Sequence, residues 1–153
     1  MEKKRVLATG VFDLLHPGHV RYLEEAKKAG GENAELVVVV ARDNTVKKAK
    51  GKAPVMPEDQ RRFLVEALRV VDSAILGYEE QEIGTILETG FKYLLSLKPD
   101  VIAVGYDQRN VEKTLRKVIA EKGLNIQIVK IGKFGKDRLN SSSKIRKKII
   151  EGK

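Results

Sequence analysis

The sequence predicts an α/β fold in which a five-stranded parallel sheet carries helices on both faces. Two observations support this fold. Short apolar runs typical of strands alternate along the chain with segments of helical spacing. One of these runs, Val37–Val40, is apolar at every position, as expected of a strand that is buried on both faces. The length of 153 residues is that of one domain, 1–153, with a core of its own.

The predicted strands are short, aliphatic segments bounded by polar or glycine-containing segments. They are expected at Arg5–Thr9, Leu36–Ala41, Ser73–Leu76, Val101–Val104 and Ile126–Ile131. In an open parallel sheet the ligand binds at the carboxyl ends of the strands, near the point where the strand order reverses. We therefore expect a site among the polar segments that follow the strands.

Helical spacing between the strands predicts helices at 20–29, 57–69, 79–97, 111–121 and 141–150. Pro17 suits the first turn of the first helix, and Gly30–Gly31 closes that helix. Gly84 and Gly90 are expected to break the helix over 79–97 into two pieces. The lysine-rich segment before Pro57 is predicted to be a loop.

Composition excludes several kinds of site and location. The chain has no cysteine, which rules out disulfides, thiolate zinc sites and cysteine nucleophiles. It has no run approaching the ~20 apolar residues needed to cross a membrane, and its first residues lack the apolar segment of a signal peptide. We therefore expect a cytoplasmic protein with no membrane partner.

The charge balance favours a polyanionic ligand. Thirty lysines and arginines stand against 21 acidic residues, a net charge of +9, and basic residues gather at 47–52 and 144–148. With four tyrosines, four phenylalanines and no tryptophan, the chain has no run of basic and aromatic residues typical of single-strand nucleic-acid binding. A small substrate rich in phosphate is expected, and no nucleic acid.

The strongest functional signal is His16-Pro17-Gly18-His19, which follows the first strand. A helix that begins here directs its free N–H groups and its positive dipole end at the preceding loop, and Gly18 lets a phosphate approach the main chain. His16 and His19 lie one helical turn apart, so both can face the same bound group. A zinc site would need a third ligand. A structural role, with one histidine as a cap and one in the core, is the alternative to the anion site that we predict.

Together with Gly10-Val11-Phe12-Asp13, this tetrapeptide resembles the GTFD…HxGH signature of the cytidylyltransferase-like nucleotidyltransferases. Within that superfamily the segments 41–46, 57–61 and 105–108 most resemble archaeal FAD synthetases, and the similarity covers essentially the whole chain. The resemblance implies a Rossmann-like nucleotidyltransferase fold. It also implies transfer of AMP from ATP to FMN, giving FAD and pyrophosphate. A divalent metal bound with the nucleotide, expected to be Mg²⁺, and a homodimeric state belong to the same expectation.

The resemblance assigns roles to the first loop. His16 and His19 match the pair that contacts the triphosphate and the transition state, which makes them the candidate catalytic residues. Asp13 matches an aspartate that helps to hold the metal–triphosphate or the acceptor, with a loop cap as its alternative role. Val11 stands where many relatives carry threonine, so that nucleotide contact at Val11 and Phe12 is expected from the backbone.

The serines Ser141, Ser142 and Ser143 line up with the ISTS-x-I element of the family. A helix start rich in hydroxyls is a second anion site, suited to the β- or γ-phosphate, although it also makes a good N-cap. The longer family form carries an arginine five residues before the first serine. This chain has Lys136 there and Arg138 nearby, which leaves the cationic partner open.

Other matches concern phosphate and base contacts. Lys50 and Lys52 match phosphate-binding lysines of a mobile loop, with a solvated loop as the alternative. Arg61 matches a family arginine able to clamp a phosphate bidentately. Arg42 and Asp43 follow the second strand at the ligand edge and are expected to contact phosphate or substrate.

The nucleotide base is expected near the last two strands. Asp107 matches a nucleotide-contacting position, and Phe134 falls where archaeal FAD synthetases place an aromatic side chain beside the base.

Two other functions stay open. One is a cytidylyltransferase that uses CTP and glycerol 3-phosphate or another phosphoalcohol. The other is a non-catalytic, basic module that binds nucleotides or RNA. The sequence contains no GxGxxG after a strand and no GxxxxGK[ST], so dinucleotide redox enzymes and P-loop kinases fit poorly.

Overall fold

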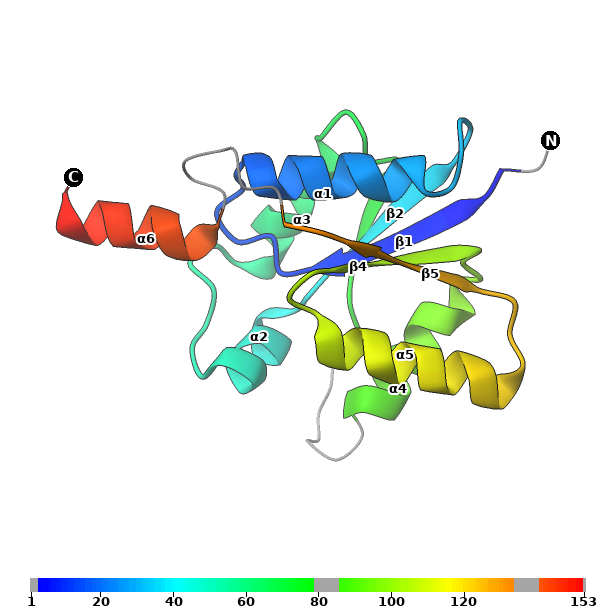
Figure 1. Ribbon diagram of the computed structural model, residues 1–153. Helices are drawn as coiled ribbons and strands as arrows, with labels where there is room; N and C mark the ends of the chain where they lie inside the picture. The colour runs from blue at the N-terminus through cyan, green and yellow to red at the C-terminus, as the bar shows by residue number, and fades with distance from the viewer. Residues whose placement is uncertain (1–2, 79–85, 134–140, 153) are drawn as a thin grey trace.

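The computed structural model describes residues 3–78, 86–133 and 141–152. Five parallel strands form one sheet in the order β3-β2-β1-β4-β5 (Figure 1). The strands are β1 Arg5–Gly10, β2 Glu35–Val40, β3 Ser73–Leu76, β4 Val101–Gly105 and β5 Gln127–Ile131. The predicted sheet is confirmed, and each strand bound lies within one residue of its predicted place.

The helices described are α1 Pro17–Lys28, α2 Asp43–Lys50, α3 Glu58–Glu66, α4 Ile86–Ser96, α5 Arg109–Lys122 and α6 Ser142–Glu151. The prediction of a loop after the second strand is wrong, because this segment contains α2. Val46 is the buried residue of α2, so the sequence shows no apolar stripe there. The helix ends at Gly51, which adopts the left-handed conformation (φ 77°) that glycine tolerates.

The two expected helix breaks have different outcomes. Gly90 lies inside α4, so the break predicted there does not occur. Gly84 lies outside the described residues. Across the described part of the chain, no helix combines the length and the apolar character that a membrane crossing requires.

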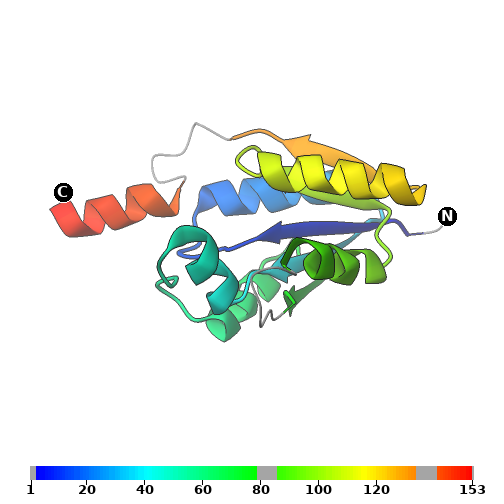
Figure 2. The same cartoon turned by 90° about the horizontal axis from the view of Figure 1, so that it is seen from below.

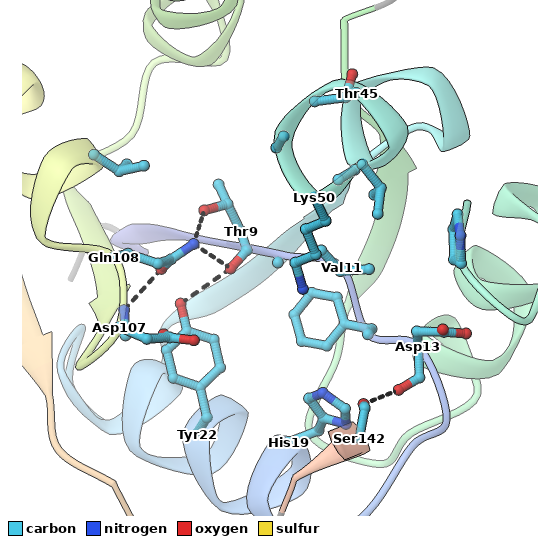
Figure 3. A pocket seen from close by; sticks show the side chains of 18 of the residues that line it. Thr9, Val11, Asp13, His19, Tyr22, Thr45, Lys50, Asp107, Gln108 and Ser142 are labelled. Carbon is cyan, nitrogen blue, oxygen red and sulfur yellow. Dashed lines mark hydrogen bonds between the residues drawn. The ribbon is translucent and has the colours of Figure 1, made fainter. Parts of the chain in front are cut away.

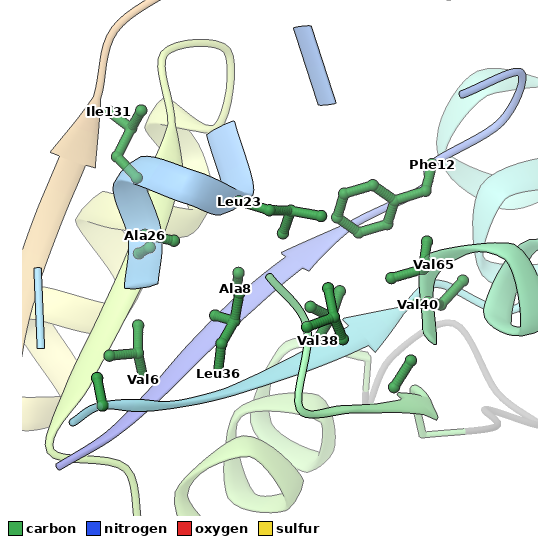
Figure 4. Packing of buried hydrophobic residues seen from close by; sticks show 14 of the residues in the cluster. Val6, Ala8, Phe12, Leu23, Ala26, Leu36, Val38, Val40, Val65 and Ile131 are labelled. Atoms are coloured by element: carbon green, nitrogen blue, oxygen red, sulfur yellow. The ribbon is translucent and has the colours of Figure 1, made fainter. Parts of the chain in front are cut away.

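The core lies on both faces of the sheet, because successive strand residues point to opposite sides. On one face α1 and α3 pack through Leu23, Ala26 and Val65 against Val6, Ala8, Leu36, Val38 and Val40 (Figure 4). On the other face α4 and α5 pack through Phe91, Leu94 and Leu115 against Leu7, Val37, Val39, Ile102 and Val104. Helices therefore cover both faces, as predicted.

The strand order determines where a ligand can bind. β1 is central, with β2 and β3 on one side of it and β4 and β5 on the other. The loop that follows β1 therefore lies at the switch point of the sheet. Beyond the same edge lies α6, close to the start of α1 in both views (Figures 1 and 2).

Candidate active site

A cavity of about 680 Å³ lies at the carboxyl edge of the sheet (Figure 3). Its walls come from the loop after β1, the starts of α1 and α6, the helix α2, and the segments that follow β3, β4 and β5. The central wall consists of Gly10, Val11, Phe12, Asp13, His16, Gly18, His19, Ser141, Ser142, Ser143 and Arg146. Asp13 and Arg146, which lie 133 positions apart in the chain, therefore meet in one cavity.

The two histidines line the cavity together. Their rings stack with centroids 3.7 Å apart and planes inclined by 24°. The Nδ1 atom of His19 accepts a hydrogen bond of 3.3 Å from the backbone N–H of His16. Because an accepting Nδ1 carries no proton, the proton of a neutral His19 ring lies on Nε2.

Both histidines are held in the neutral form. Burial, followed by repulsion from His16 and from Lys50, outweighs the attraction of Asp13 and lowers the pKa of His19 to about 3. Burial also lowers the pKa of His16. At neutral pH the pair thus offers uncharged imidazole N–H groups, which donate hydrogen bonds without any proton transfer.

The backbone before the histidines is shaped by Phe12. This residue has a positive φ of 56°, and its ring is buried with a centroid 5.4 Å from that of His19. A Cβ on Gly10 would lie 2.8 Å from the Phe12 ring, so the strand must end in glycine here. The Phe12 ring therefore belongs to the core beneath His19.

Asp13 links three segments of the site through hydrogen bonds. Its buried carboxylate accepts hydrogen bonds from the backbone N–H groups of Val55 (2.8 Å) and Met56 (3.0 Å) and from the guanidinium of Arg146 (2.5 Å). Burial alone would raise the pKa of Asp13, but these donors outweigh it and lower the pKa. The hydroxyl of Ser142 also donates to the Asp13 carbonyl. One residue thus joins the β1 loop, the segment before α3 and the start of α6.

The start of α6 faces the start of α1 across the cavity. All three serines line it, and the Ser141 hydroxyl caps the helix by accepting from the N–H of Lys144 at 3.2 Å. Arg146, which the sequence analysis missed, lies one turn along the same helix and lines the cavity as well. The candidates Phe134, Lys136 and Arg138 lie outside the described residues.

The two lysines reach the cavity from its other side. Lys50 is the last residue of α2, Lys52 follows it, and both line the cavity. Figure 3 shows Lys50 extending from α2 into the space above Val11. Two lysines, two helix starts and Arg146 therefore surround the histidine pair with positive potential.

Arg61 does not line the cavity, and the phosphate clamp expected of it does not fit this structure. Its side chain is fully buried and donates to the carbonyls of Met56, Val11 and Ala41 at 2.7–2.9 Å and to the carboxylate of Asp43 at 2.7 Å. With four donor contacts made internally, Arg61 fixes the β1 and β2 loops instead. The sequence could not distinguish this internal guanidinium from one that faces a ligand.

Arg42 and Asp43, both expected to contact phosphate or substrate, differ in their positions. Asp43 is tied to Arg61, whereas Arg42 lines the cavity. Arg42 also donates to the carbonyl of Gly77 at 2.8 Å and to Glu58 at 3.0 Å. Its bonds fix the segments after β2 and β3 relative to α3.

On the β4 side, Asp107 lines the cavity together with residues that the sequence analysis missed. Gln108 accepts from the N–H of Gly105 at 2.8 Å and donates to the Thr9 hydroxyl at 3.3 Å. The Tyr22 hydroxyl donates toward the carbonyls of Thr9 and Ala103, and burial raises the pKa of Tyr22 (Figure 3). These bonds join the ends of β1 and β4. Tyr22 lies one turn beyond His19, and that spacing was the available signal.

On the β2 and β3 side the wall is apolar and aromatic. It is formed by Val39, Tyr78, Phe91, Tyr93 and Leu94. Phe91, Tyr93 and Leu94 follow the apolar periodicity of α4, and Val39 belongs to the apolar run of β2, so the sequence did not separate them from ordinary core positions.

No group of three or more His, Cys, Asp or Glu residues suited to a metal occurs among the residues that the structure describes. The carboxylate oxygens of Asp13 already accept three hydrogen bonds. The buried Asp13 carboxylate is therefore already occupied by protein donors.

Comparison with known proteins agrees with this geometry. The cytidylyltransferase-like family model matches residues 7–148. The FAD synthase of Aciduliprofundum boonei is 46% identical over 147 residues, which cover 96% of this chain and 91% of that protein. The FAD synthase of Ferroglobus placidus is 50% identical over 96% of this chain and 88% of its own length.

A solved structure resembles the fold throughout. The crystal structure titled as the lipopolysaccharide core biosynthesis protein from Thermoplasma volcanium has a TM-score of 0.73 and 45% identity, and the match covers 88% of this chain and all of that one. The resemblance to cytidylyltransferase-like proteins and to archaeal FAD synthetases is therefore confirmed, as is the expectation of a nucleotidyltransferase of the FAD synthase type. The chain belongs to the cytidylyltransferase-like family and is a nucleotidyltransferase.

Proposed function

We propose that this chain transfers AMP from ATP to FMN, giving FAD and pyrophosphate. The observation that carries the proposal is the stacked pair of His16 and His19, which lies where two helix starts and two lysines meet. FMN is inferred as the acceptor from the FAD synthases, which are 46–50% identical to this protein over nearly the whole chain.

The reaction needs little covalent help from the protein. An oxygen of the FMN phosphate attacks the α-phosphorus of ATP, a new P–O bond forms, and the bond to the β-phosphate breaks with release of pyrophosphate. The attacking oxygen is already anionic, so no general base is required. Catalysis then rests on alignment of the two phosphates and on stabilisation of the charge that builds up on them.

His16 and His19 are proposed to stabilise the transition state. His19 lines the cavity, and its Nε2–H is the donor that a neutral ring can offer there, since Nδ1 is occupied as an acceptor. Loss of one such preorganised donor costs about 3–4 kcal/mol of transition-state stabilisation. Gly18 beside them keeps the main chain open to the triphosphate.

The remaining cations and hydroxyls are proposed to bind the triphosphate and the acceptor phosphate. Lys50 and Lys52 act from the α2 side, and the three serines act from the start of α6, Ser142 through its backbone N–H because its hydroxyl donates to the Asp13 carbonyl. The Nε–H of Arg146 has no acceptor among the described residues, which leaves a donor for a bound phosphate. Arg42 is proposed to face the acceptor phosphate.

The nucleoside is proposed to lie on the β4 side. Asp107 is suited to accept hydrogen bonds from ribose hydroxyls, and the backbone of Val11 and Phe12 is available to the base. The aromatic contact from Phe134 stays a prediction.

Mg²⁺ is proposed to enter as part of the MgATP substrate, in keeping with the lack of a metal site among the described side chains. Metal chelation is expected to prevent turnover without affecting the folded state, because no described residue depends on a metal for its position. A homodimeric state, a cytoplasmic location and the absence of a nucleic-acid partner stay predictions from the sequence.

The test is a matrix of donors and acceptors. ATP and CTP are each offered with FMN and with glycerol 3-phosphate, and pyrophosphate release and product are measured. The expected result is FAD from ATP and FMN, lost in His16→Ala. Formation of a CDP-alcohol with no FAD would favour the cytidylyltransferase alternative. Nucleotide binding without turnover in any pairing would favour the non-catalytic module.

A further inference from the structure

The cavity has two chemically different side walls. One wall comes from β2, the segment after β3 and the helix α4, and the other comes from the segments after β4 and β5. We call them the aromatic wall, formed by Val39, Tyr78, Phe91, Tyr93 and Leu94, and the polar wall, formed by Tyr106, Asp107, Gln108, Gly132 and Lys133. The histidine pair lies between them.

The aromatic wall is fixed in place by packing and by hydrogen bonds. Phe91 and Leu94 are buried, with 7% and 9% of their surfaces exposed, and their exposed edges face the cavity. The Tyr93 hydroxyl donates to the carbonyl of Leu76 at 3.2 Å, which holds its ring. The ring of Tyr78 lies 6.2 Å from that of Tyr93 and is 45% exposed. Tyr78 thus presents an aromatic face on a rigid apolar support.

The polar wall suits a different kind of group. It holds the carboxylate of Asp107 and the amide of Gln108, and the ammonium of Lys133 lies 5.6 Å from the centre of the Tyr106 ring. Hydroxyls and heteroatoms of a nucleoside find hydrogen-bond partners here. A large, mainly apolar ring system does not.

In-line transfer places the two substrates on different walls. The entering phosphate and the leaving pyrophosphate lie on opposite sides of the α-phosphorus, and the reacting phosphates are held at the centre by the histidine pair. The adenosine is joined to the α-phosphorus through its 5′-oxygen, which lies off this axis. The ring systems of the donor and of the acceptor therefore leave the centre in different directions.

We propose that the isoalloxazine ring of FMN binds the aromatic wall, with Tyr78 as the residue that stacks on it and determines acceptor specificity. The adenosine of ATP then occupies the polar wall. This assignment rests on the proposed function. A flat tricyclic ring buries most of its surface against an apolar, aromatic wall, and an offset-stacked aromatic pair adds to that burial.

The chain offers a matched pair of variants for the test. Tyr78 and Tyr106 both line the cavity, one on each wall, and their exposures are alike at 45% and 41%. Tyr78→Ala is expected to raise KM for FMN about tenfold, the effect of losing one stacking partner, and to change KM for ATP less than twofold. Tyr106→Ala is expected to raise KM for ATP and to change KM for FMN less than twofold.

Two further variants separate the ring from the hydroxyl and from apolar bulk. Tyr78→Phe keeps the ring and should retain the wild-type KM for FMN. Tyr78→Leu keeps the bulk without the ring and should reduce the quenching of FMN fluorescence measured without ATP. This second variant and measurement also serve if Tyr78→Ala does not fold, as monitored by circular dichroism and thermal melting.

The outcomes are distinct. An increase of KM for ATP alone in Tyr78→Ala would mean that the walls are exchanged and would overturn the assignment. Unchanged KM for FMN in both Tyr78→Ala and Tyr78→Leu would overturn it as well. If the wild-type protein makes no FAD from ATP and FMN, the proposed function itself fails, and that result is visible before any variant is made.

Discussion

The guanidinium of Arg146 donates a hydrogen bond of 2.5 Å to the buried carboxylate of Asp13, which lies 133 positions away in the chain. This ion pair ties α6 to the loop after β1 and so places the three serines opposite the histidines. Only 4% of the Asp13 side chain is exposed, against 27% for Arg146. A pair this well buried is costly to break from one side, since the remaining charge stays desolvated.

A double-mutant cycle measures this pair. Asp13→Asn and Arg146→Gln should each lower the free energy of unfolding by about 2–4 kcal/mol, and the double variant should lose less than the sum of the two. Urea unfolding of all four proteins gives the coupling. Strictly additive losses would show that the pair does not hold α6 in place.

Removal of the His19 ring should affect turnover far more than nucleotide binding. His19→Ala is expected to lower kcat by about 10²–10³, the effect of losing one donor aimed at the transition state. His19→Gln, whose amide nitrogen can stand in for Nε2, should recover part of this loss. The test is to measure kcat by steady-state kinetics and, separately, the affinity for ATP without FMN. A large loss of ATP affinity with kcat unchanged would contradict the prediction.

The low pKa of His19 makes stability depend on pH. The folded protein holds this pKa at about 3, against an ordinary value of 6.5. Between these values the unfolded chain binds a proton that the folded protein does not, so stability is complete above pH 6.5 and falls as the pH decreases below it. The pKa of Asp13 is lowered from 3.8, so its contribution is lost only below that pH.

We therefore expect the urea concentration at the unfolding midpoint to decrease as the pH is lowered from 7 to 5. The midpoint of His19→Asn should decrease less over the same pH range. Some decrease should remain, because burial also lowers the pKa of His16. Equal pH slopes for the wild type and His19→Asn would show that folding does not lower the pKa of His19.

Arg61 is buried and its neighbour Arg62 is partly exposed, so substitutions at the two positions compare an internal arginine with a surface one. Arg61→Ala leaves three main-chain carbonyls and Asp43 without their buried partner, and should cost about 3–5 kcal/mol of unfolding free energy. Arg62 pairs with Glu66 and its side chain is 34% exposed, so Arg62→Ala should cost about 1 kcal/mol or less. Thermal melting of both compares them. If Arg61→Ala were stable and had a raised KM for ATP, Arg61 would bind phosphate as the sequence analysis expected.

The sequence predicted the strands well because burial on both faces leaves an unmistakable pattern. The run Val37–Val40 is apolar throughout, and each strand bound was found within one residue. The helix α2 was missed for the opposite reason, since Val46 is the residue that it buries and its remaining positions look like a solvated loop. Its first residue, Asp43, pairs with Arg61 of α3, a tertiary contact that the local sequence does not reveal.

The candidate site shows the same division. The residues of the first loop follow one another in the sequence, as do the three serines, so each group could be recognised as a motif, and the family resemblance assigned both to the nucleotide site; both line the cavity. Arg146 and Tyr78 lie in segments with ordinary helix or loop character, and only the fold brings them to the cavity. The direction in which Arg61 points was equally invisible, because a guanidinium satisfies carbonyls and phosphates with the same donors.

The link between Asp13 and α6 has a consequence for how the protein acquires its activity. The sheet is built from strands that end by Ile131, whereas one side of the catalytic pocket comes from residues after position 140. Contacts of such long range form late in folding, because the closure of a long loop costs entropy before any contact rewards it. The hydrophobic scaffold and the reactive pocket therefore draw on different stretches of the chain, and the pocket is complete only when α6 has docked.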